Sequence, residues 1–425
     1  MSDLLKRDQK VVWHPFAPFK GGYPTLPLKA AKGMYLELED GRKIMDAVSS
    51  WWVNLYGHSR PELIETLTKQ YGLIDHVIFS GFTHEPAVKL GELLCEKLPG
   101  DMKRIFFSDD GSTSVEVGMK MALQYHHNLG KPKNKIVSIE GAYHGDTFGV
   151  MSAAGKSDFF KAFNDLFFEI EQIPLPNNKN EEDVIDQFTK ICESGKVAGF
   201  VFEPLIQGSA GMRIYPAKIL NELCKIARAN DVIIIADEVM TGFGRTGEFV
   251  AVNHLATEVP DIICLSKGIT GGILPLGVTM ANAKIEAGFQ SADIDKVFYH
   301  GHSYTACALT CALAETSINL FFSDEIQDQI SKVKSWHKHY ISKFKFSEKV
   351  TRIESLGTIL AIEVKQDETS YFSELKYKIY DFFMSKNILL RPLGNVVYIM
   401  APYIIKKEEM LSVYEAIDEF FAELI

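Results

Sequence analysis

The feature that most constrains the fold is a regular alternation of short apolar runs and amphipathic stretches between about residues 100 and 300. The runs are rich in Val, Ile and Phe and lack strict polar–apolar alternation, which is typical of strands buried on both faces of a parallel sheet. Between them, the stretches 112–128 and 217–230 have helical spacing. The expected strands are Arg104–Ser108, Lys135–Glu140, Ala198–Glu203, Val232–Asp237 and Asp261–Ser266. This alternation predicts an α/β domain whose functional groups follow the carboxyl ends of strands.

The two ends of the chain have a different pattern. Residues 33–48 alternate around Asp40-Gly41, which is a hairpin signal, and residues 388–400 repeat that pattern around Leu393-Gly394-Asn395. A chain of 425 residues also exceeds what one hydrophobic core usually supports. We therefore expect a large central domain and a small α/β domain formed by both termini. The expected divisions are 1–48, 49–325 and 326–425.

Composition and charge exclude several classes of partner. The net charge of −10, without a dense Lys/Arg patch, argues against nucleic acid. The amino terminus lacks the apolar stretch of a signal peptide, and runs such as Val232–Ala236 are too short to span a bilayer. Six cysteines without a CxxC pair fit reduced thiols, and His300-Gly301-His302 lacks supporting metal ligands. We expect a cytoplasmic protein that binds no metal, membrane or nucleic acid.

Two expected strands are followed by small or aromatic residues suited to a bound ligand. Gly111 and Ser112 begin a helix, where free backbone N–H groups and the helix dipole favour an anion, although taken alone they fit a plain N-cap by Ser112 or Asp110 better. Tyr143 lies between glycines at the next strand end and has the shape to cover a planar ring, or to pack in an ordinary loop.

Two further strand ends carry charge. Asp237 directly follows an apolar strand, where an unpaired carboxylate is costly to bury. It is either a counter-ion for a protonated pyridine nitrogen, or an N-cap or ion-pair partner of Arg245. Lys267 ends the next apolar strand, where it either reaches the surface or, with a lowered pKa, attacks a carbonyl.

A competing motif is the stretch from Gly242 to Gly247, which satisfies G-x-G-x-x-G. A dinucleotide site would need a helix opening at Gly247 and an acid at the end of a strand. The residues after Gly247 have no helical pattern, and Asp261 begins its strand. A nicotinamide enzyme is therefore disfavoured, and a serine hydrolase lacks its G-x-S-x-G motif.

Together the four strand ends predict a site for pyridoxal 5′-phosphate (PLP): a phosphate nest, an aromatic cover, an acid for the ring nitrogen and a lysine for the aldehyde. From about Trp13 to Tyr403 the sequence resembles the class III (ω-type) aminotransferases. The most specific stretches are ADEVMTGFGRTG and SKGITGG, which contains Lys267. The resemblance implies PLP fold type I, with a large α/β/α domain, a mostly parallel sheet and a small α/β domain.

Within the family, the sequence is most similar to the members that convert 8-amino-7-oxononanoate to 7,8-diaminononanoate in biotin biosynthesis. This similarity rests on Trp13-His14-Pro15-Phe16, Ser49-Ser50-Trp51-Trp52, Tyr143-His144-Gly145-Asp146-Thr147, Gly301-His302-Ser303 and Arg391-Pro392-Leu393-Gly394. It implies a homodimeric PLP enzyme with S-adenosylmethionine as the expected amino donor.

The resemblance also implies individual roles. Lys267 would form the Schiff base and shuttle protons, Asp237 would pair with the ring nitrogen, and Tyr143 would pack over the ring. Gly111 and Ser112 would bind the phosphate, and Glu203 would support the hydroxyl side of the ring. Gly301, His302 and Ser303 would reach the phosphate and substrate from the partner subunit. Phe16 and Trp51 would line the substrate pocket, and Arg391 would hold a substrate carboxylate, for which its planar fork is suited.

Two positions depart from the family pattern. Phe16 stands where Tyr is usual, and Gly301-His302-Ser303 stands where Gly-Pro-Thr is common. The second form also resembles relatives that use lysine as donor, so lysine is the alternative to S-adenosylmethionine. The sequence is also compatible with an ω-aminotransferase acting on ornithine, 4-aminobutyrate or a diamine, and with a non-catalytic protein of this fold. The intact pair of Lys267 and Asp237 argues against a non-catalytic protein.

Overall fold

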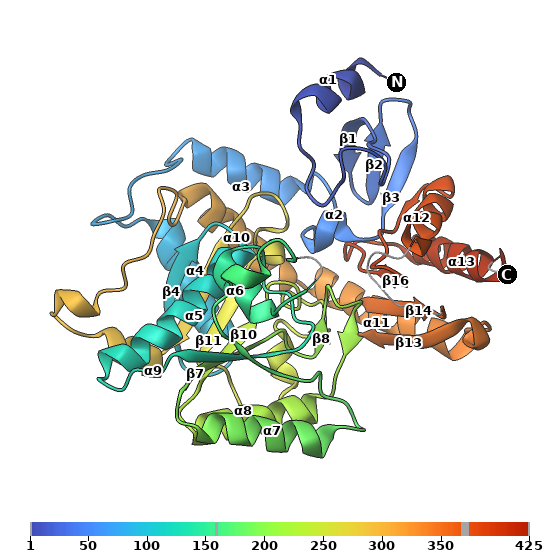
Figure 1. Cartoon of the computed structure of the whole chain (residues 1–425). Coiled ribbons are helices and arrows are strands. Elements are labelled where there is room, and N and C mark those ends of the chain that lie inside the picture. Colours follow the sequence, from blue (N-terminus) through green and yellow to red (C-terminus); the bar gives the residue numbers. More distant parts are fainter. Residues whose placement is uncertain (1, 158–159, 367–373, 424–425) are drawn as a thin grey trace. The chain divides into compact units, whose positions relative to one another are not determined.

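The computed structural model describes residues 2–157, 160–366 and 374–423. The chain divides into two compact units, which we call the terminal unit (Met1–Pro61 with Glu325–Ile425) and the central unit (Glu62–Asp324). In Figure 1 the terminal unit carries the blue and the orange-to-red ends of the chain.

The central unit alternates strands and helices along the sequence. Its helices are α3 (Pro61–Tyr71), α4 (Glu85–Lys97), α5 (Gly111–Asn128), α6 (Phe148–Ala154), α7 (Glu181–Glu193), α8 (Ala217–Ala229), α9 (Ala283–Phe289) and α10 (Ala308–Phe321), with 3₁₀ turns η1 (Asn164–Leu166), η2 (Ala251–His254), η3 (Lys267–Thr270) and η4 (Ile294–Lys296). Its strands are β4 (Met102–Ser108), β5 (Lys135–Ile139), β6 (Glu171–Ile173), β7 (Val197–Phe202), β8 (Ile206–Gln207), β9 (Arg213–Ile214), β10 (Ile233–Asp237), β11 (Ile262–Leu265) and β12 (Gly277–Asn282).

Seven of these strands form one sheet in the order β4-β12-β11-β10-β7-β5-β6. The pairs from β11 to β6 are parallel. β12 runs antiparallel to both β11 and β4, so β4 points in the same direction as β11. The predicted α/β fold with a mostly parallel sheet and flanking helices is confirmed, whereas the antiparallel β12 was not predicted.

The sheet is buried because its strands are apolar on both faces. Every residue of β7, β10 and β11 is buried. On one face, Ile233 and Ile235 share a core cluster with Val115, Met119 and other residues of α5. On β10 the intervening Ile234 points to the other face, since side chains alternate along a strand. Helix α8 also packs against β10 and lies side by side with α7 (Figure 1).

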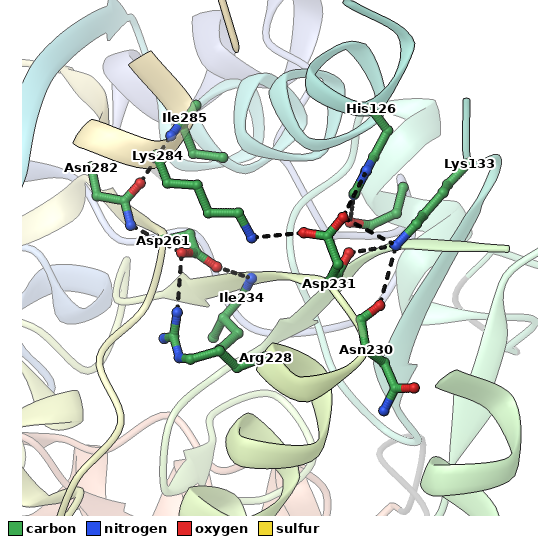
Figure 2. A network of polar contacts seen from close by, with 11 residues as sticks. His126, Lys133, Arg228, Asn230, Asp231, Ile234, Asp261, Asn282, Lys284 and Ile285 are labelled. Atoms are coloured by element: carbon green, nitrogen blue, oxygen red, sulfur yellow. Dashed lines mark hydrogen bonds and ion pairs between the residues drawn. The ribbon is translucent and has the colours of Figure 1, made fainter. Parts of the chain in front are cut away.

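A network of charged and polar groups fixes the amino ends of β10 and β11 (Figure 2). Asp231, just before β10, accepts a hydrogen bond from Lys284 Nζ at 3.0 Å. Asp261, just before β11, accepts from the backbone N–H of Ile234 and from Asn282 Nδ2, both at 2.9 Å. Asp261 therefore ties three adjacent strands together, and β11 begins directly after it.

The terminal unit combines both ends of the chain. Its helices are α1 (Asp3–Val11), α2 (Ser49–Trp52), α11 (Asp324–Lys343), α12 (Leu375–Ser385) and α13 (Lys407–Glu423), with the turn η5 (Ser347–Lys349). Its strands are β1 (Leu28–Lys32), β2 (Tyr35–Leu38), β3 (Lys43–Asp46), β13 (Val350–Leu356), β14 (Ile359–Val364), β15 (Ile388–Leu389) and β16 (Val396–Ile399). They form two sheets, β1-β2-β3-β15 and β13-β14-β16.

One of the two predicted hairpins exists. β2 and β3 pair antiparallel around Asp40 and Gly41, as the sequence predicted. The second prediction, at 388–400, is wrong: β15 pairs in parallel with β3, whereas β16 pairs with β14 of the other sheet. Only a local bridge joins Leu393 and Val396. Residues 388–400 therefore connect two sheets, because each flanking strand finds a longer-range partner. Among the described residues no helix is long and apolar enough to cross a membrane.

Candidate active site

Four side chains meet at the carboxyl edge of the central sheet, and we call them the carboxylate–lysine cluster: His144, Glu203, Asp237 and Lys267. Each comes from a strand end. Glu203 directly follows β7, Asp237 ends β10, Lys267 lies two residues after β11, and His144 follows β5. Since these strands are parallel, their carboxyl ends lie at one edge, where α/β proteins place their ligands.

Asp237 and His144 form the closest pair in this cluster. His144 Nδ1 lies 2.7 Å from Asp237 Oδ2, and Asp237 Oδ1 accepts the Val239 N–H at 3.0 Å. Burial alone would lower the pKa of His144, but the hydrogen bond and charge of Asp237 outweigh it and raise the pKa. Asp237 and His144 therefore form a buried, directly hydrogen-bonded acid–imidazole pair.

Glu203 is held by the backbone. Its Oε1 accepts the Tyr143 N–H at 3.0 Å, and its Oε2 accepts the Gly208 N–H at 2.9 Å. Burial raises the pKa of Glu203 to about 7, with the negative charge of Asp237 adding to this rise and the charge of His144 opposing it. The hydrogen bond from its N–H places Tyr143, whose side chain is partly exposed, beside the cluster.

Lys267 has the electrostatics of a nucleophilic amine. Protein atoms surround its amino group, although the residue as a whole is partly exposed. This burial lowers the pKa of Lys267, and the charges of Asp237 and Glu203 moderate the effect. A lowered pKa increases the fraction of neutral amine, which is the form that attacks a carbonyl.

The start of α5 forms a tight backbone cradle. Asp110 caps the helix by accepting the Thr113 N–H at 2.8 Å, and Ser112 Oγ accepts the Asp146 N–H at 3.1 Å. A side chain at Gly145 would place its Cβ 2.0 Å from Ser112 Oγ, so the two loops approach closely only because residue 145 is glycine. The N-cap interpretation applies to Asp110, and Gly111 begins an 18-residue helix whose N-terminus favours an anion.

A second group, the aromatic–arginine cluster, lies in the terminal unit and consists of Phe16, Tyr23, Trp51 and Arg391. The guanidinium carbon of Arg391 lies 4.6 Å from the Trp51 ring centroid and 5.0 Å from that of Tyr23. Phe16 contacts Trp51 with ring centroids 5.6 Å apart. The predicted substrate residues of the two chain ends are thus brought together, and the flat guanidinium lies against two aromatic rings.

The neighbouring tryptophan has a different environment. Trp52 is buried, its Nε1–H donates to the Tyr398 hydroxyl at 2.9 Å, and the two rings pack edge to face. Trp51 is 37% exposed. Of the tandem tryptophans, Trp52 is therefore a core residue, and Trp51 presents the accessible indole.

The loop containing Gly301, His302 and Ser303 lies between η4 and α10. The His302 N–H donates to Thr305 Oγ1 at 3.1 Å, and His76 Nε2 donates to the Ser303 carbonyl at 2.5 Å. Gly301 and Ser303 are exposed. These contacts fix the loop within its own unit, and its expected role across a subunit interface stays a prediction.

Sequence reasoning missed two residues of these clusters. His144 belongs to the predicted Tyr143 motif, and its position beside Tyr143 at a strand end is a usable signal. Tyr23 lies outside the predicted motifs, and its contact with Arg391 joins segments more than 300 residues apart, which no local pattern reveals. In the described part of the chain no group of three or more His, Cys, Asp or Glu could hold a metal ion.

The central site fits PLP on its own geometry. It offers a buried carboxylate for a protonated ring nitrogen, an amine of lowered pKa, and a helix N-terminus for phosphate. His144 Nε2 is buried without a hydrogen-bond partner among the described residues, which leaves one polar contact for a bound group.

Comparison with known proteins decides the family. The model of "Aminotransferase class-III" matches residues 19–421. The chain belongs to the class III aminotransferases. It is therefore a PLP-dependent transaminase, and both the predicted family and the predicted cofactor are confirmed.

Named relatives extend over nearly the whole chain of this aminotransferase. It is 41% identical over 421 residues to the adenosylmethionine-8-amino-7-oxononanoate aminotransferase of Synechococcus elongatus, and the match covers 97% of this chain and 99% of the relative. The crystal structure of the adenosylmethionine-8-amino-7-oxononanoate aminotransferase from Methanocaldococcus jannaschii superposes with a TM-score of 0.92 at 33% identity, covering 99% and 98% of the two chains. A PMP-bound aminotransferase from Vibrio fluvialis has a TM-score of 0.87 at 25% identity, covering 99% and 98%.

Proposed function

We propose that this aminotransferase converts 8-amino-7-oxononanoate to 7,8-diaminononanoate in biotin biosynthesis. The observation that carries the proposal is the aromatic–arginine cluster, in which Trp51 and Tyr23 hold the Arg391 guanidinium. A planar fork held in this way suits a long acceptor that carries a carboxylate at its far end. Relatives 31–41% identical that bear the name of this activity support the same assignment.

We propose Lys267, Asp237 and Tyr143 as the catalytic residues. When bound, PLP supplies an electron sink for the carbon that carries the amino group. Nζ of Lys267, whose pKa burial lowers, would hold the cofactor and would take and return the proton that moves during transamination. The Asp237 carboxylate would hold a proton at the ring nitrogen, and His144 orients that carboxylate through its 2.7 Å hydrogen bond.

The remaining cofactor contacts follow from the same edge of the sheet. Gly111 and Ser112 would bind the phosphate through the N-terminus of α5. Glu203, fixed by two backbone N–H groups, would support the hydroxyl side of the ring.

We further propose a homodimer and a division of labour between a small domain and a large one. Gly301, His302 and Ser303 would complete the phosphate site of the partner subunit and reach its substrate. The stretches 1–48 and 326–425 would act as a small domain carrying the substrate residues Phe16 and Arg391, and 49–325 as the large cofactor domain.

Complementation tests the dimer: mixing a Lys267→Ala chain with a Ser303→Trp chain should restore activity in heterodimers. If verified heterodimers stay inactive, the two residues belong to the same chain's site.

The proposed amino donor is S-adenosylmethionine. The half-exposed face of Trp51 suits a sulfonium or an adenine ring, through contacts worth about 0.5–2 kcal/mol. Lysine is the second candidate, favoured by the Gly301-His302-Ser303 form of the loop.

Two measurements test these assignments separately. The absorbance of the bound cofactor should change when S-adenosylmethionine is added without acceptor, and mass spectrometry should then find 7,8-diaminononanoate once 8-amino-7-oxononanoate is added. If lysine alone changes the spectrum, the donor proposal is wrong. If ornithine, 4-aminobutyrate or a diamine reacts and 8-amino-7-oxononanoate never does, the acceptor proposal is wrong.

A further inference from the structure

The backbone that carries Trp51 has an unusual conformation. Ser49, Ser50, Trp51 and Trp52 are consecutive, and all have positive φ angles, of 51°, 57°, 124° and 72°. Side-chain-bearing residues rarely adopt such angles, because Cβ approaches the backbone oxygen atoms. Four in a row persist only where the surroundings hold them. The indole of the proposed substrate site is therefore presented by a strained turn.

Asp46 holds this turn from inside the terminal unit. The side chain is fully buried, and its Oδ1 accepts the N–H groups of Val48 at 3.2 Å and Ser50 at 3.0 Å. Its Oδ2 accepts from Ser50 Oγ at 2.8 Å. Burial alone would raise the pKa of Asp46, but the hydrogen bonds from His58 and Ser50 outweigh it and lower the pKa, so the group is an acceptor at neutral pH.

His58 completes the support. Its Nε2 lies 3.0 Å from Asp46 Oδ2, where it donates, since Asn54 Nδ2 lies 3.2 Å from its Nδ1. The backbone of His58 is fixed in turn, because its N–H and C=O exchange hydrogen bonds with Gly33 at 2.8 and 2.9 Å. Asp46 is thus held between strand β3, which it ends, and an anchored imidazole.

The other side of the turn is tied to a different part of the unit. Ser49 Oγ donates to the Met400 carbonyl at 2.7 Å, and Trp52 Nε1 donates to Tyr398. With Ser49 and Trp52 fixed at the ends and Ser50 fixed by Asp46, Trp51 has little freedom of position. Its ring lies 4.6 Å from the Arg391 guanidinium carbon.

We propose that Asp46, oriented by His58, is a positioning residue for recognition of the acceptor carboxylate. It holds the left-handed Ser49–Trp52 turn, so that the Trp51 indole keeps the Arg391 guanidinium in a binding-competent orientation. This inference rests on the proposed acceptor site, and it assigns a role in specificity to a buried acid.

The test compares Asp46→Ala with Asp46→Asn and with Asp40→Ala. Asn retains an oxygen that accepts the Val48 and Ser50 N–H groups. Asp40 is the matched control, because it also accepts a backbone N–H two residues ahead but is exposed in the β2–β3 hairpin. Asp46→Ala should raise KM for 8-amino-7-oxononanoate by roughly 10- to 100-fold, as expected for a small misplacement of a binding group, with kcat within about threefold of wild type. Asp46→Asn should restore most of the loss, and Asp40→Ala should change nothing.

A readout that needs no substrate separates this inference from the proposed function. In enzyme labelled with 5-fluorotryptophan, the ¹⁹F resonance of Trp51, assigned with Trp51→Phe, should shift or broaden in Asp46→Ala, while those of Trp13 and Trp336 stay in place. If 8-amino-7-oxononanoate is not a substrate at all, this resonance still decides whether Asp46 holds the indole.

The outcomes that overturn the inference are definite. An unchanged Trp51 resonance, or a fall in kcat and melting temperature at unchanged KM, would give Asp46 a merely structural role. If Asp46→Ala does not fold, Ser50→Ala is the deciding variant. It removes the hydrogen bond from Ser50 Oγ to Asp46, so it should shift or broaden the Trp51 resonance and raise KM by about threefold or more. An unmoved resonance and KM in folded Ser50→Ala would overturn the inference.

Discussion

The two candidate clusters are built in opposite ways. In the carboxylate–lysine cluster each residue follows a strand of one sheet, so that the sheet itself places Glu203, Asp237 and Lys267 at a common edge. In the aromatic–arginine cluster, Trp51 and Arg391 come from chain ends 340 positions apart and meet through a strained turn. The first arrangement is dictated by fold topology, whereas the second depends on individual hydrogen bonds. We therefore expect changes in the first to abolish chemistry and changes in the second to alter substrate recognition.

The largest effect is expected at Lys267. Lys267→Ala removes the proposed covalent anchor and proton carrier together, so kcat should fall by more than the roughly 10²–10⁴-fold attributed to acid–base catalysis alone. Borohydride treatment of the wild type should fix pyridoxal on the peptide containing Lys267. Lys284→Ala is the matched control, because Lys284 pairs with Asp231 at the opposite edge of the sheet and should leave kcat unchanged. Label on any other lysine would refute the assignment.

Asp237→Asn should give the second-largest effect. The amide keeps the shape but loses the charge proposed to hold the ring nitrogen protonated, and kcat should fall by about 10²–10⁴-fold with a smaller loss of cofactor affinity. Asp261→Asn is the matched control, since Asp261 lies at the amino end of the neighbouring strand and accepts hydrogen bonds from Ile234 and Asn282. That variant should lose stability and keep kcat. Equal losses of kcat in both variants would contradict a specific role for Asp237.

The two clusters also differ in how well the sequence predicts them. The strand ends at Gly111, Tyr143, Asp237 and Lys267 were predictable, because burial on both faces imposes a continuous apolar run and a polar residue marks where that run ends. The family resemblance added the substrate residues. The turn that presents Trp51 was not predictable, since nothing in Ser-Ser-Trp-Trp favours positive φ. The groups that hold it, Asp46, His58, Tyr398 and Met400, include two that lie more than 340 residues away in sequence.

The erroneous hairpin at 388–400 has the same physical origin. Alternation and a Leu-Gly-Asn turn are compatible with a hairpin, but β15 and β16 are recruited into different sheets by β3 and β14. Local pattern decides whether a strand forms, whereas its partner depends on contacts distant in sequence. The same limit applies to the pairing of His144 with Asp237.

A third prediction concerns stability and pH in the cofactor-free enzyme. Burial raises the pKa of Glu203 from 4.5 to about 7, so the folded state binds a proton more tightly than the unfolded state. The stability from this group is complete below about pH 4.5 and is lost as pH rises through about 7. Over that window the loss of unfolding free energy is on the order of 3 kcal/mol. The free energy of unfolding, measured with urea between pH 5 and 8, should therefore depend less on pH in Glu203→Gln than in the wild type. Parallel pH profiles for the two proteins would show that Glu203 does not titrate in this range.

The smallest effect is expected for Arg391→Lys, because lysine keeps the positive charge and loses only the planar shape of the guanidinium. Arg391→Lys retains the positive charge but replaces a flat fork, held between Trp51 and Tyr23, by a flexible ammonium that cannot bind a carboxylate in the same bidentate way. KM for 8-amino-7-oxononanoate should rise roughly tenfold, equivalent to about 1.4 kcal/mol, with kcat nearly unchanged. Arg352→Lys is the matched control, because Arg352 bonds Glu354 and Glu363 on the β13–β14 pair. If Arg391→Lys instead lowered kcat at constant KM, the guanidinium would act on the transition state, and the separation of chemistry from recognition between the two clusters would fail.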